Sequence, residues 1–182
     1  MDAVTLIKET KEEGLVKQEY HGGNGSILIR FYDSQGKTHR DNGPAIQINE
    51  GYKEWRYHGL YHRVGGPAIV HENGDEEWYL FGKKHREDGP AVTYESGKIQ
   101  RWIVHGLKHR INGPATIYHN EKRYYINGKK YTKDMYFSIL KIMKIFITKT
   151  KKRLTKKLAE KYYQAGFDRD VASIIASYNI YM

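Results

Sequence analysis

The 182-residue sequence contains no cysteine. This absence excludes disulfide bonds, zinc–thiolate centres and cysteine nucleophiles, because each of them requires a thiol group. It is compatible with a reducing compartment, where disulfides are rare. The sequence also shows no glycine-rich phosphate loop ending in Lys-Ser/Thr, no paired-carboxylate site and no Ser-His-Asp order. We therefore predict that the protein is not an enzyme and that it uses no cofactor.

Long hydrophobic runs are missing as well. No stretch approaches the roughly 20 apolar residues that a membrane-spanning helix needs. Residues 1–9 include no basic start and no long apolar run, so we expect no signal peptide. These features predict a soluble protein of the cytoplasm.

Proline is scarce, and its four occurrences share one context, the motif His-Arg-x-x-Gly-Pro-Ala. The first to fourth copies of this motif begin at His39, His62, His85 and His109, at steps of 23, 23 and 24 residues. A motif that recurs at such a period predicts an array of stacked structural units.

Each copy of the motif is followed by the signals of a β-hairpin. After Gly-Pro-Ala comes a short strand and then a turn, such as Glu72-Asn73-Gly74. Tight hairpin turns need positive φ, which glycine adopts freely and asparagine tolerates. The second strand carries an aromatic residue, for example Trp55, with Tyr57 two positions later. Period two would place both side chains on one face, and we expect the tryptophans to fill the core between hairpins.

The pattern Trp-x-x-x-Gly-x-x-His-Arg-x-x-Gly-Pro-Ala resembles the MORN repeat, in the divergent form common in large DNA viruses of amoebae. The resemblance covers roughly residues 36–131 and implies a β-rich fold, a single-layer antiparallel stack of β-hairpins with about 23 residues per repeat. Arginine stands where the standard MORN motif has its first glycine, so the lipid binding claimed for some MORN proteins transfers poorly. The resemblance also implies a viral origin, either as a minor structural component of a virion or as an effector in the host cytoplasm.

Three segments are predicted along the chain. Residues 1–26 form a lead-in, expected to be a short helix before a turn or else disordered. Residues 27–131 form the repeat array, whose last copy decays because Tyr131-Thr132 replaces His-Arg. Residues 132–182 form a basic segment of C-terminal α-helices, with apolar residues at three- and four-residue steps. Residues 148–150 are a candidate break in the first helix, and a short final helix is expected over 169–178.

The repeated His-Arg pairs are the most conspicuous candidate site. Evenly spaced histidines would suit a metal or polyanion site, and His58 with His62 shows a His-x-x-x-His spacing. However, Gly59 interrupts that spacing, and no acidic or cysteine ligand recurs in every copy. We therefore interpret the motif as scaffold and predict no metal site. The residues predicted to build the repeat are His39, Gly43, Pro44, Trp55, His62, Gly66, Pro67, Trp78, His85, Gly89, Pro90, Trp102, His109, Gly113, Pro114 and Tyr124.

Aromatic residues offer a second candidate surface. The tryptophans would suit a stacking platform for bases or sugars, although burial in the repeat core is the favoured interpretation. Tyrosine buries a large area at low entropic cost and is enriched in protein interfaces. The tyrosines predicted for a protein-binding face are Tyr61, Tyr79, Tyr94, Tyr118 and Tyr125.

Positive charge is concentrated in the C-terminal third. The net charge of the chain is +10, and residues 132–182 contain nine Lys and two Arg against four acidic residues. Such a helix suits nucleic-acid phosphate, an anionic membrane surface or an acidic protein, although a basic run is often only a solvated face. The candidate anion-binding residues form one flank of the helix, the basic flank: Lys149, Lys152, Arg153, Lys156 and Lys157.

The sequence as a whole predicts a non-catalytic repeat scaffold that binds a protein partner, with no small-molecule substrate. The alternative is a protein that binds nucleic acid or an anionic membrane through the basic helix. Assembly into oligomers is compatible with both.

Overall fold

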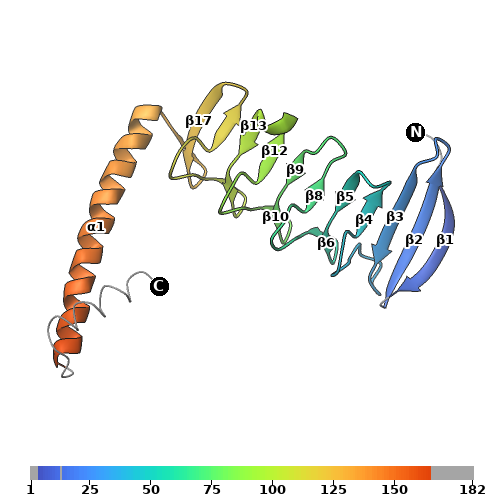
Figure 1. Ribbon diagram of the computed structural model, residues 1–182, viewed down its shortest axis with the longest axis horizontal. Helices are drawn as coiled ribbons and strands as arrows, with labels where there is room; N and C mark the ends of the chain where they lie inside the picture. Colours follow the sequence, from blue (N-terminus) through green and yellow to red (C-terminus); the bar gives the residue numbers. More distant parts are fainter. Residues whose placement is uncertain (1–3, 13, 165–182) are drawn as a thin grey trace. The chain divides into compact units, whose positions relative to one another are not determined.

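The computed structural model describes residues 4–12 and 14–164 of the chain. The chain divides into two compact units, Met1–Thr132 and Lys133–Met182. The first unit is an array of β-hairpins and the second contains a helix (Figure 1). The predicted fold class is confirmed at this level: a long antiparallel sheet of hairpin strands is followed by one C-terminal helix.

The main sheet of the array has twelve strands, and they follow one another in chain order (Figure 1). Its strands are β1 (Val4–Glu12), β2 (Leu15–Gly22), β3 (Ile27–Tyr32), β4 (Ile46–Ile48), β5 (Tyr52–Glu54), β8 (Ile69–Val70), β9 (Glu76–Glu77), β12 (Val92–Tyr94), β13 (Ile99–Arg101), β16 (Thr116–Tyr118), β17 (Glu121–Ile126) and β18 (Lys129–Tyr131). A short 3₁₀ helix, Glu95–Gly97, joins β12 to β13. All pairings are antiparallel, so most contacts are between neighbours in the chain.

Three small two-stranded hairpins accompany the main sheet. They pair β6 (Arg56–Tyr57) with β7 (Leu60–Tyr61), β10 (Tyr79–Leu80) with β11 (Lys83–Lys84), and β14 (Ile103–Val104) with β15 (Leu107–Lys108). In the first of them, His58 and Gly59 have φ of 45° and 86°. Two consecutive residues with positive φ form the tight turn that suits a two-residue hairpin loop.

The tryptophans lie where the chain leaves the main sheet for a small hairpin. Trp55 stands between β5 and β6; its N–H donates to the Ala68 carbonyl at 2.8 Å, and its carbonyl accepts from the His62 N–H at 3.1 Å. The backbone of Trp55 therefore bonds to two different partners. The expected continuous strand, with Trp55 and Tyr57 on one face, is wrong, because the strand is broken at the tryptophan. Trp55 is half-buried, whereas Tyr57 is exposed.

The alanine that ends each motif lies at the centre of the array. Ala45, Ala68, Ala91 and Ala115 are fully buried. The Ala68 N–H donates to the Glu77 carbonyl at 2.8 Å, and its carbonyl accepts from Trp55, so the backbone of this alanine bonds to segments on both sides. Around Ala91 the core also contains Val92 and Ile103, with Trp78 and Tyr94 packed against them. The small methyl group allows main chain and aromatic rings to pack close together.

Residues 4–12 and 15–22 form strands, so the prediction of a helix or of disorder in the lead-in is wrong for this part of the chain. β1 pairs with β2, and β2 pairs with β3 over six residue pairs from Val16↔Tyr32 to His21↔Ile27. The sheet of the array thus extends into the segment that precedes the first motif. The physical reason is that β3 offers β2 a free edge, and edge pairing outweighs the weak hydrophobic pattern of this segment.

The helix α1 (Lys133–Gln164) is continuous across residues 148–150, so the candidate break is not found. The final helix predicted over 169–178 lies outside the described residues. Among the residues described, no helix contains a stretch long and apolar enough to cross a membrane.

Candidate interaction surface

Each arginine of the motif stacks on an aromatic ring that precedes it in the chain. The guanidinium carbon of Arg63 lies 3.7 Å from the ring centroid of Trp55, and that of Arg86 lies 3.8 Å from Trp78. Arg110 stacks on Trp102 at 3.7 Å in the same way. A guanidinium over an indole face is a favourable cation–π contact. The sequence reasoning missed this contact, although the spacing of eight residues between Trp and Arg in three copies was its signal.

The glycine of Gly-Pro-Ala is explained by the same arginine. A Cβ atom at Gly89 would lie 2.7 Å from Cζ of Arg86, and one at Gly66 would lie 2.9 Å from Cζ of Arg63. The guanidinium therefore packs on the glycine as well as on the tryptophan. Arg63 also donates from Nη1 to the Pro67 carbonyl at 3.1 Å. In the second and fourth copies the motif loop is thus closed by its own arginine.

The histidine of each motif binds the backbone of the next small hairpin. In the second copy, Nδ1 of His62 accepts a hydrogen bond from the Phe81 N–H at 3.3 Å, and in the third, Nδ1 of His85 accepts from the His105 N–H at 3.1 Å. His39 makes the same contact in the first copy, and His109 of the fourth copy accepts from the Asn127 N–H in the turn between β17 and β18. Since Nδ1 is the acceptor, this geometry assigns the proton of a neutral ring to Nε2. The histidines therefore join neighbouring copies.

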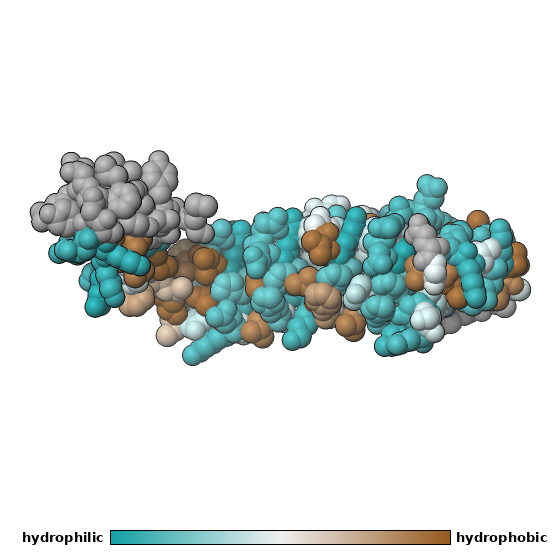
Figure 2. All heavy atoms as spheres, turned by 90° about the horizontal axis from the view of Figure 1, so that it is seen from below, coloured by the Kyte–Doolittle hydropathy of each residue, from teal (hydrophilic) through white to brown (hydrophobic). Residues whose placement is uncertain are grey.

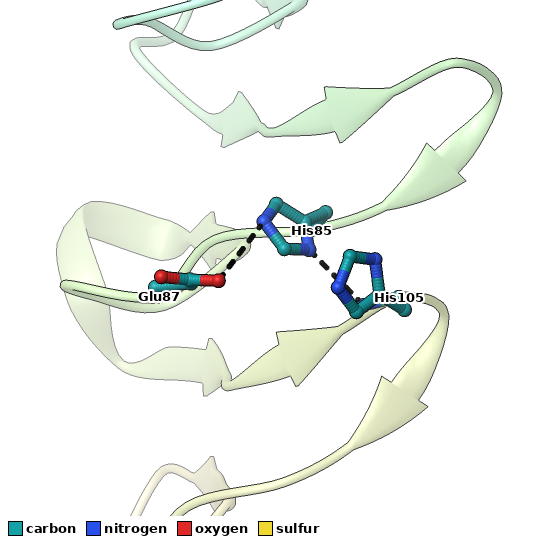
Figure 3. A group of neighbouring side chains, drawn as sticks. All are labelled: His85, Glu87 and His105. Atoms are coloured by element: carbon teal, nitrogen blue, oxygen red, sulfur yellow. Dashed lines mark hydrogen bonds and ion pairs between the residues drawn. The ribbon is translucent and has the colours of Figure 1, made fainter.

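One group of side chains in the described part of the chain has the composition of a metal site: His85, Glu87 and His105, whose ligand atoms lie within 4.8 Å of one another. His85 lies between the other two, 3.9 Å from the Glu87 carboxylate through Nε2 (Figure 3). A metal ion bound to Nδ1 of His85 would displace the hydrogen bond from the His105 N–H. A metal ion bound to Nε2 would require the ring proton on Nδ1, where it would clash with the same N–H. Either way, metal binding would break the hydrogen bond between His85 and His105.

The second copy shows whether the position equivalent to His105 needs a metal-binding side chain. There Phe81 stands at the equivalent position, and its ring stacks on His62 at a centroid distance of 4.1 Å. Phenylalanine offers no ligand atom, yet it makes the same ring contact and the same backbone hydrogen bond. We therefore interpret the ring at His105 as a packing partner of His85, and the group as part of the scaffold.

Buried carboxylates form a polar network on the main sheet. Glu77 is 8% exposed and accepts hydrogen bonds from the Tyr79 hydroxyl at 2.8 Å, from the Tyr94 hydroxyl and from Nζ of Lys84 at 2.6 Å. Burial raises the pKa of Glu77, but the hydrogen bonds from Lys84, Tyr94 and Tyr79 outweigh it and hold this pKa below its usual value. In a similar way Glu54 accepts from the hydroxyl of Tyr52 at 2.5 Å. These groups stabilise the array.

The network engages two of the tyrosines predicted for a binding face, which remain partly exposed. The hydroxyls of Tyr79 and Tyr94 are bound to Glu77, and the ring of Tyr61 lies 5.0 Å from that of Tyr79. Tyr125 is half-buried, whereas Tyr118 is exposed. The structure thus groups Tyr61, Tyr79 and Tyr94 around Glu77 and does not bring all five tyrosines together as one surface.

The exposed residues around the motif alternate between copies. In the second copy Leu60 and Val64 flank the histidine and are 50% and 81% exposed; in the fourth copy Leu107 and Ile111 occupy these positions and are 51% and 53% exposed. We call these residues the apolar pairs. The same positions in the first and third copies carry charges, Lys37 with Asp41 and Lys83 with Glu87, all exposed. The sequence contains this alternation, but only the structure shows that these positions are exposed while the rest of the motif is buried.

The space-filling view shows how hydrophobic side chains are distributed over one face of the array. Along the face of the array seen in Figure 2, hydrophobic side chains lie in separate groups between hydrophilic ones. No single apolar surface covers that face.

Grooves lie between consecutive motif loops. One groove, of about 550 Å³, is lined by Asp41, Trp55 and Val64 among others. A second, of about 480 Å³, is lined by the equivalent residues Glu87, Trp102 and Ile111. Each groove therefore has an acidic residue on one wall and one member of an apolar pair on the other.

The basic flank lies on the second unit. All five of its residues are exposed along α1. Their placement on one helix agrees with the sequence prediction, but exposure alone does not distinguish an anion site from a solvated face.

The chain matches no family model, and no curated protein and no solved structure was found to be similar to it.

Proposed function

We propose that this chain is a non-catalytic repeat scaffold whose hairpin array binds a protein partner. The observation that carries the proposal is the recurrence of the apolar pairs at equivalent positions of the second and fourth copies. These four large apolar side chains are each at least half exposed. Their recurrence at equivalent positions distinguishes them from singly scattered surface residues, which need no explanation. The proposal applies to both settings that the MORN resemblance implies, a virion and the host cytoplasm.

The internal contacts of the motif support a scaffold role. The histidine binds the next hairpin, the arginine covers the tryptophan, and the glycine makes room for the arginine. The repeated residues are therefore used inside the array, while the residues that differ between copies point to solvent. This division is the one expected of a rigid support that presents a specific surface.

The spacing of the apolar pairs restricts the partner. Neighbouring strands lie about 4.8 Å apart, so two copies of two strands each separate the apolar pairs by roughly 19 Å. An α-helix of about 13 residues spans this distance, at 1.5 Å per residue. The third copy lies between the two apolar pairs and carries Lys83 and Glu87 at the equivalent positions. The partner must therefore place polar groups opposite these two charged residues. We therefore expect a partner with two apolar anchors separated by a polar segment.

A photo-crosslinking experiment tests this proposal. A photoreactive amino acid is placed at position 60 or 107 of the full chain, and Lys122, an exposed residue of β17, serves as the control position. We expect the same partner protein to be crosslinked from positions 60 and 107 and not from position 122. The double variant Leu60→Asp/Leu107→Asp should abolish its capture.

Three results would overturn the proposal. The first is capture of unrelated proteins from positions 60 and 107. The second is capture that survives the double Asp variant. The third is a turnover activity that a single His→Ala change in the motif abolishes, because the histidines would then act on a substrate.

A further inference from the structure

We propose that α1 binds an anionic lipid surface, with its first half inserted between the lipid headgroups and its second half bound to their phosphates. This site uses residues of the second unit only, so it is independent of the partner surface on the array. The inference rests on how apolar and basic residues are distributed along and around α1.

The first half of α1 is apolar and exposed. Between Met135 and Ile147 the only residues that are neither apolar nor aromatic are Ser138, Lys141 and Lys144. Ile142 is 67% exposed and Phe146 is 69% exposed. Apolar side chains exposed to this extent over several helical turns are typical of a surface that binds a protein or a membrane.

The second half of α1 is basic. From Lys149 to Lys161 there are seven Lys and Arg residues and one acidic residue, Glu160. The basic residues of this half are exposed. The helix thus changes from an apolar to a cationic surface near Thr148.

The two halves direct these surfaces to similar sides of the helix. At about 100° per residue, Met135, Ile139, Ile142, Met143 and Phe146 fall within an arc of roughly 100°. The basic flank occupies an arc of roughly 140°, and the centres of the two arcs differ by only about 60°. Phe137 and Ile145 lie outside the apolar arc, so the first half is apolar over more than this one face. A planar surface that contacts Phe146 therefore also contacts the basic flank.

A lipid surface satisfies both kinds of residue. Headgroup phosphates attract lysine and arginine, and the boundary with the acyl chains accepts isoleucine and phenylalanine. A nucleic-acid duplex offers phosphates to the basic flank, but it would leave Ile142 and Phe146 without an apolar partner. Because α1 is not apolar enough to span a bilayer, it would lie in the plane of the interface.

Vesicle sedimentation with the full-length protein tests the proposal. The vesicles contain phosphatidylcholine alone or phosphatidylcholine with about 30% phosphatidylserine, at low and high salt. We expect binding to the anionic vesicles at low salt, weaker binding at high salt, and little binding to neutral vesicles. The variants Ile142→Ser/Phe146→Ser and Lys152→Gln/Lys156→Gln/Lys157→Gln should each reduce partitioning by roughly tenfold or more.

Matched controls on the array separate lipid binding from a general loss of charge or hydrophobicity. Lys122→Gln/Lys129→Gln/Lys130→Gln removes the same number of charges, and Leu60→Ser/Leu107→Ser removes two exposed apolar side chains; both should change partitioning less than about twofold. Circular dichroism checks that the helix variants keep their helix. The Leu60/Leu107 variant should lose the partner of the array while it keeps lipid binding, so failures of the two proposals are distinguishable.

Three results would overturn this inference. The first is no binding to anionic vesicles at low salt. The second is full binding by the Ile142→Ser/Phe146→Ser variant, which would reduce the interaction to adsorption of charge. The third is tighter binding to a DNA duplex than to vesicles, unaffected by the same two serines, which would assign the basic flank to nucleic acid.

Discussion

At the scale of single residues, the motif is a set of matched shapes. The arginine fills the space above the glycine and covers the tryptophan. The energetic effect of substituting one of these three residues should therefore depend on the other two. This coupling can be measured at Gly89, where φ lies outside the left-handed region and a side chain adds no backbone strain.

The substitution Gly89→Ala should lower the free energy of unfolding by about 1–3 kcal/mol, because the new methyl group displaces the Arg86 guanidinium. In an Arg86→Ala background the same substitution should have a much smaller effect, since the guanidinium is absent. Urea denaturation of the four proteins of this double-mutant cycle measures the coupling. Equal losses in both backgrounds would show that the arginine is not the reason for the glycine.

The histidine of the motif acts as a hydrogen-bond acceptor. Replacing His85 by leucine leaves the His105 N–H without its partner and should destabilise the array by about 1–3 kcal/mol. Replacing it by asparagine keeps an acceptor on a similar-sized side chain and should have a smaller effect. Thermal or urea unfolding compares the two variants. A leucine variant as stable as the asparagine variant would argue for ring packing alone.

Asp33 predicts a specific dependence of stability on pH. Its carboxylate accepts from Nδ1 of His58 at 2.6 Å and from the N–H groups of Gln35 and Lys37 at 2.9 Å. The hydrogen bond from His58, followed by these backbone bonds, lowers the pKa of Asp33 to about 2. A carboxyl group with a depressed folded pKa stabilises the protein above its unfolded pKa, and this contribution is lost as the pH falls through the folded pKa.

Stability of the native sequence should therefore decline between about pH 4 and pH 2, as protons bind Asp33 in the unfolded chain first. The isosteric variant Asp33→Asn should be less stable at neutral pH and should decline less in this window. Urea midpoints followed by tryptophan fluorescence at several pH values test this. Parallel pH profiles for the two proteins would remove Asp33 as the cause.

At the scale of elements, each tryptophan joins the main sheet to a small hairpin. Trp78 packs on Ala91, Val92 and Ile103, and Arg86 covers its outer face. Trp78→Ala should therefore lower the free energy of unfolding by about 3 kcal/mol, the lower end of the range for core tryptophans, because the ring is only half-buried. Urea denaturation followed by far-UV circular dichroism measures it. A loss below about 1 kcal/mol would instead favour an exposed stacking platform.

At the scale of the whole molecule, the array is one-dimensional. Its hydrogen bonds and ring contacts join each copy mainly to its neighbours, as between His62 and Phe81 or between His85 and His105. Substitutions in copies that do not touch should then act independently.

The effects of Arg63→Ala and Arg110→Ala on the free energy of unfolding should add within about 0.5 kcal/mol. Arg86→Ala combined with Gly89→Ala, within one copy, should not add. Urea denaturation of Arg63→Ala, Arg110→Ala and their double variant, beside the Arg86/Gly89 cycle, supplies the values required. A coupling well above this limit between Arg63 and Arg110 would mean that the array behaves as a single cooperative core.

Turn residues and hydrophobic spacing are local properties, so they predicted the hairpin character of the array and the helical nature of the C-terminal segment. The sequence also located the motif and the basic flank. Other features of the fold and of the surface depend on tertiary contacts. The strand of residues 15–22 depends on pairing with β3, and the strand of residues 4–12 on pairing with β2, which no local pattern reports. The arginine–tryptophan stack, the histidine bridges and the carboxylate network join residues that meet only when the chain folds back on itself. Only with those residues assigned to the interior did the apolar pairs, and the face of α1 that joins apolar and basic residues, stand out as surfaces left for binding.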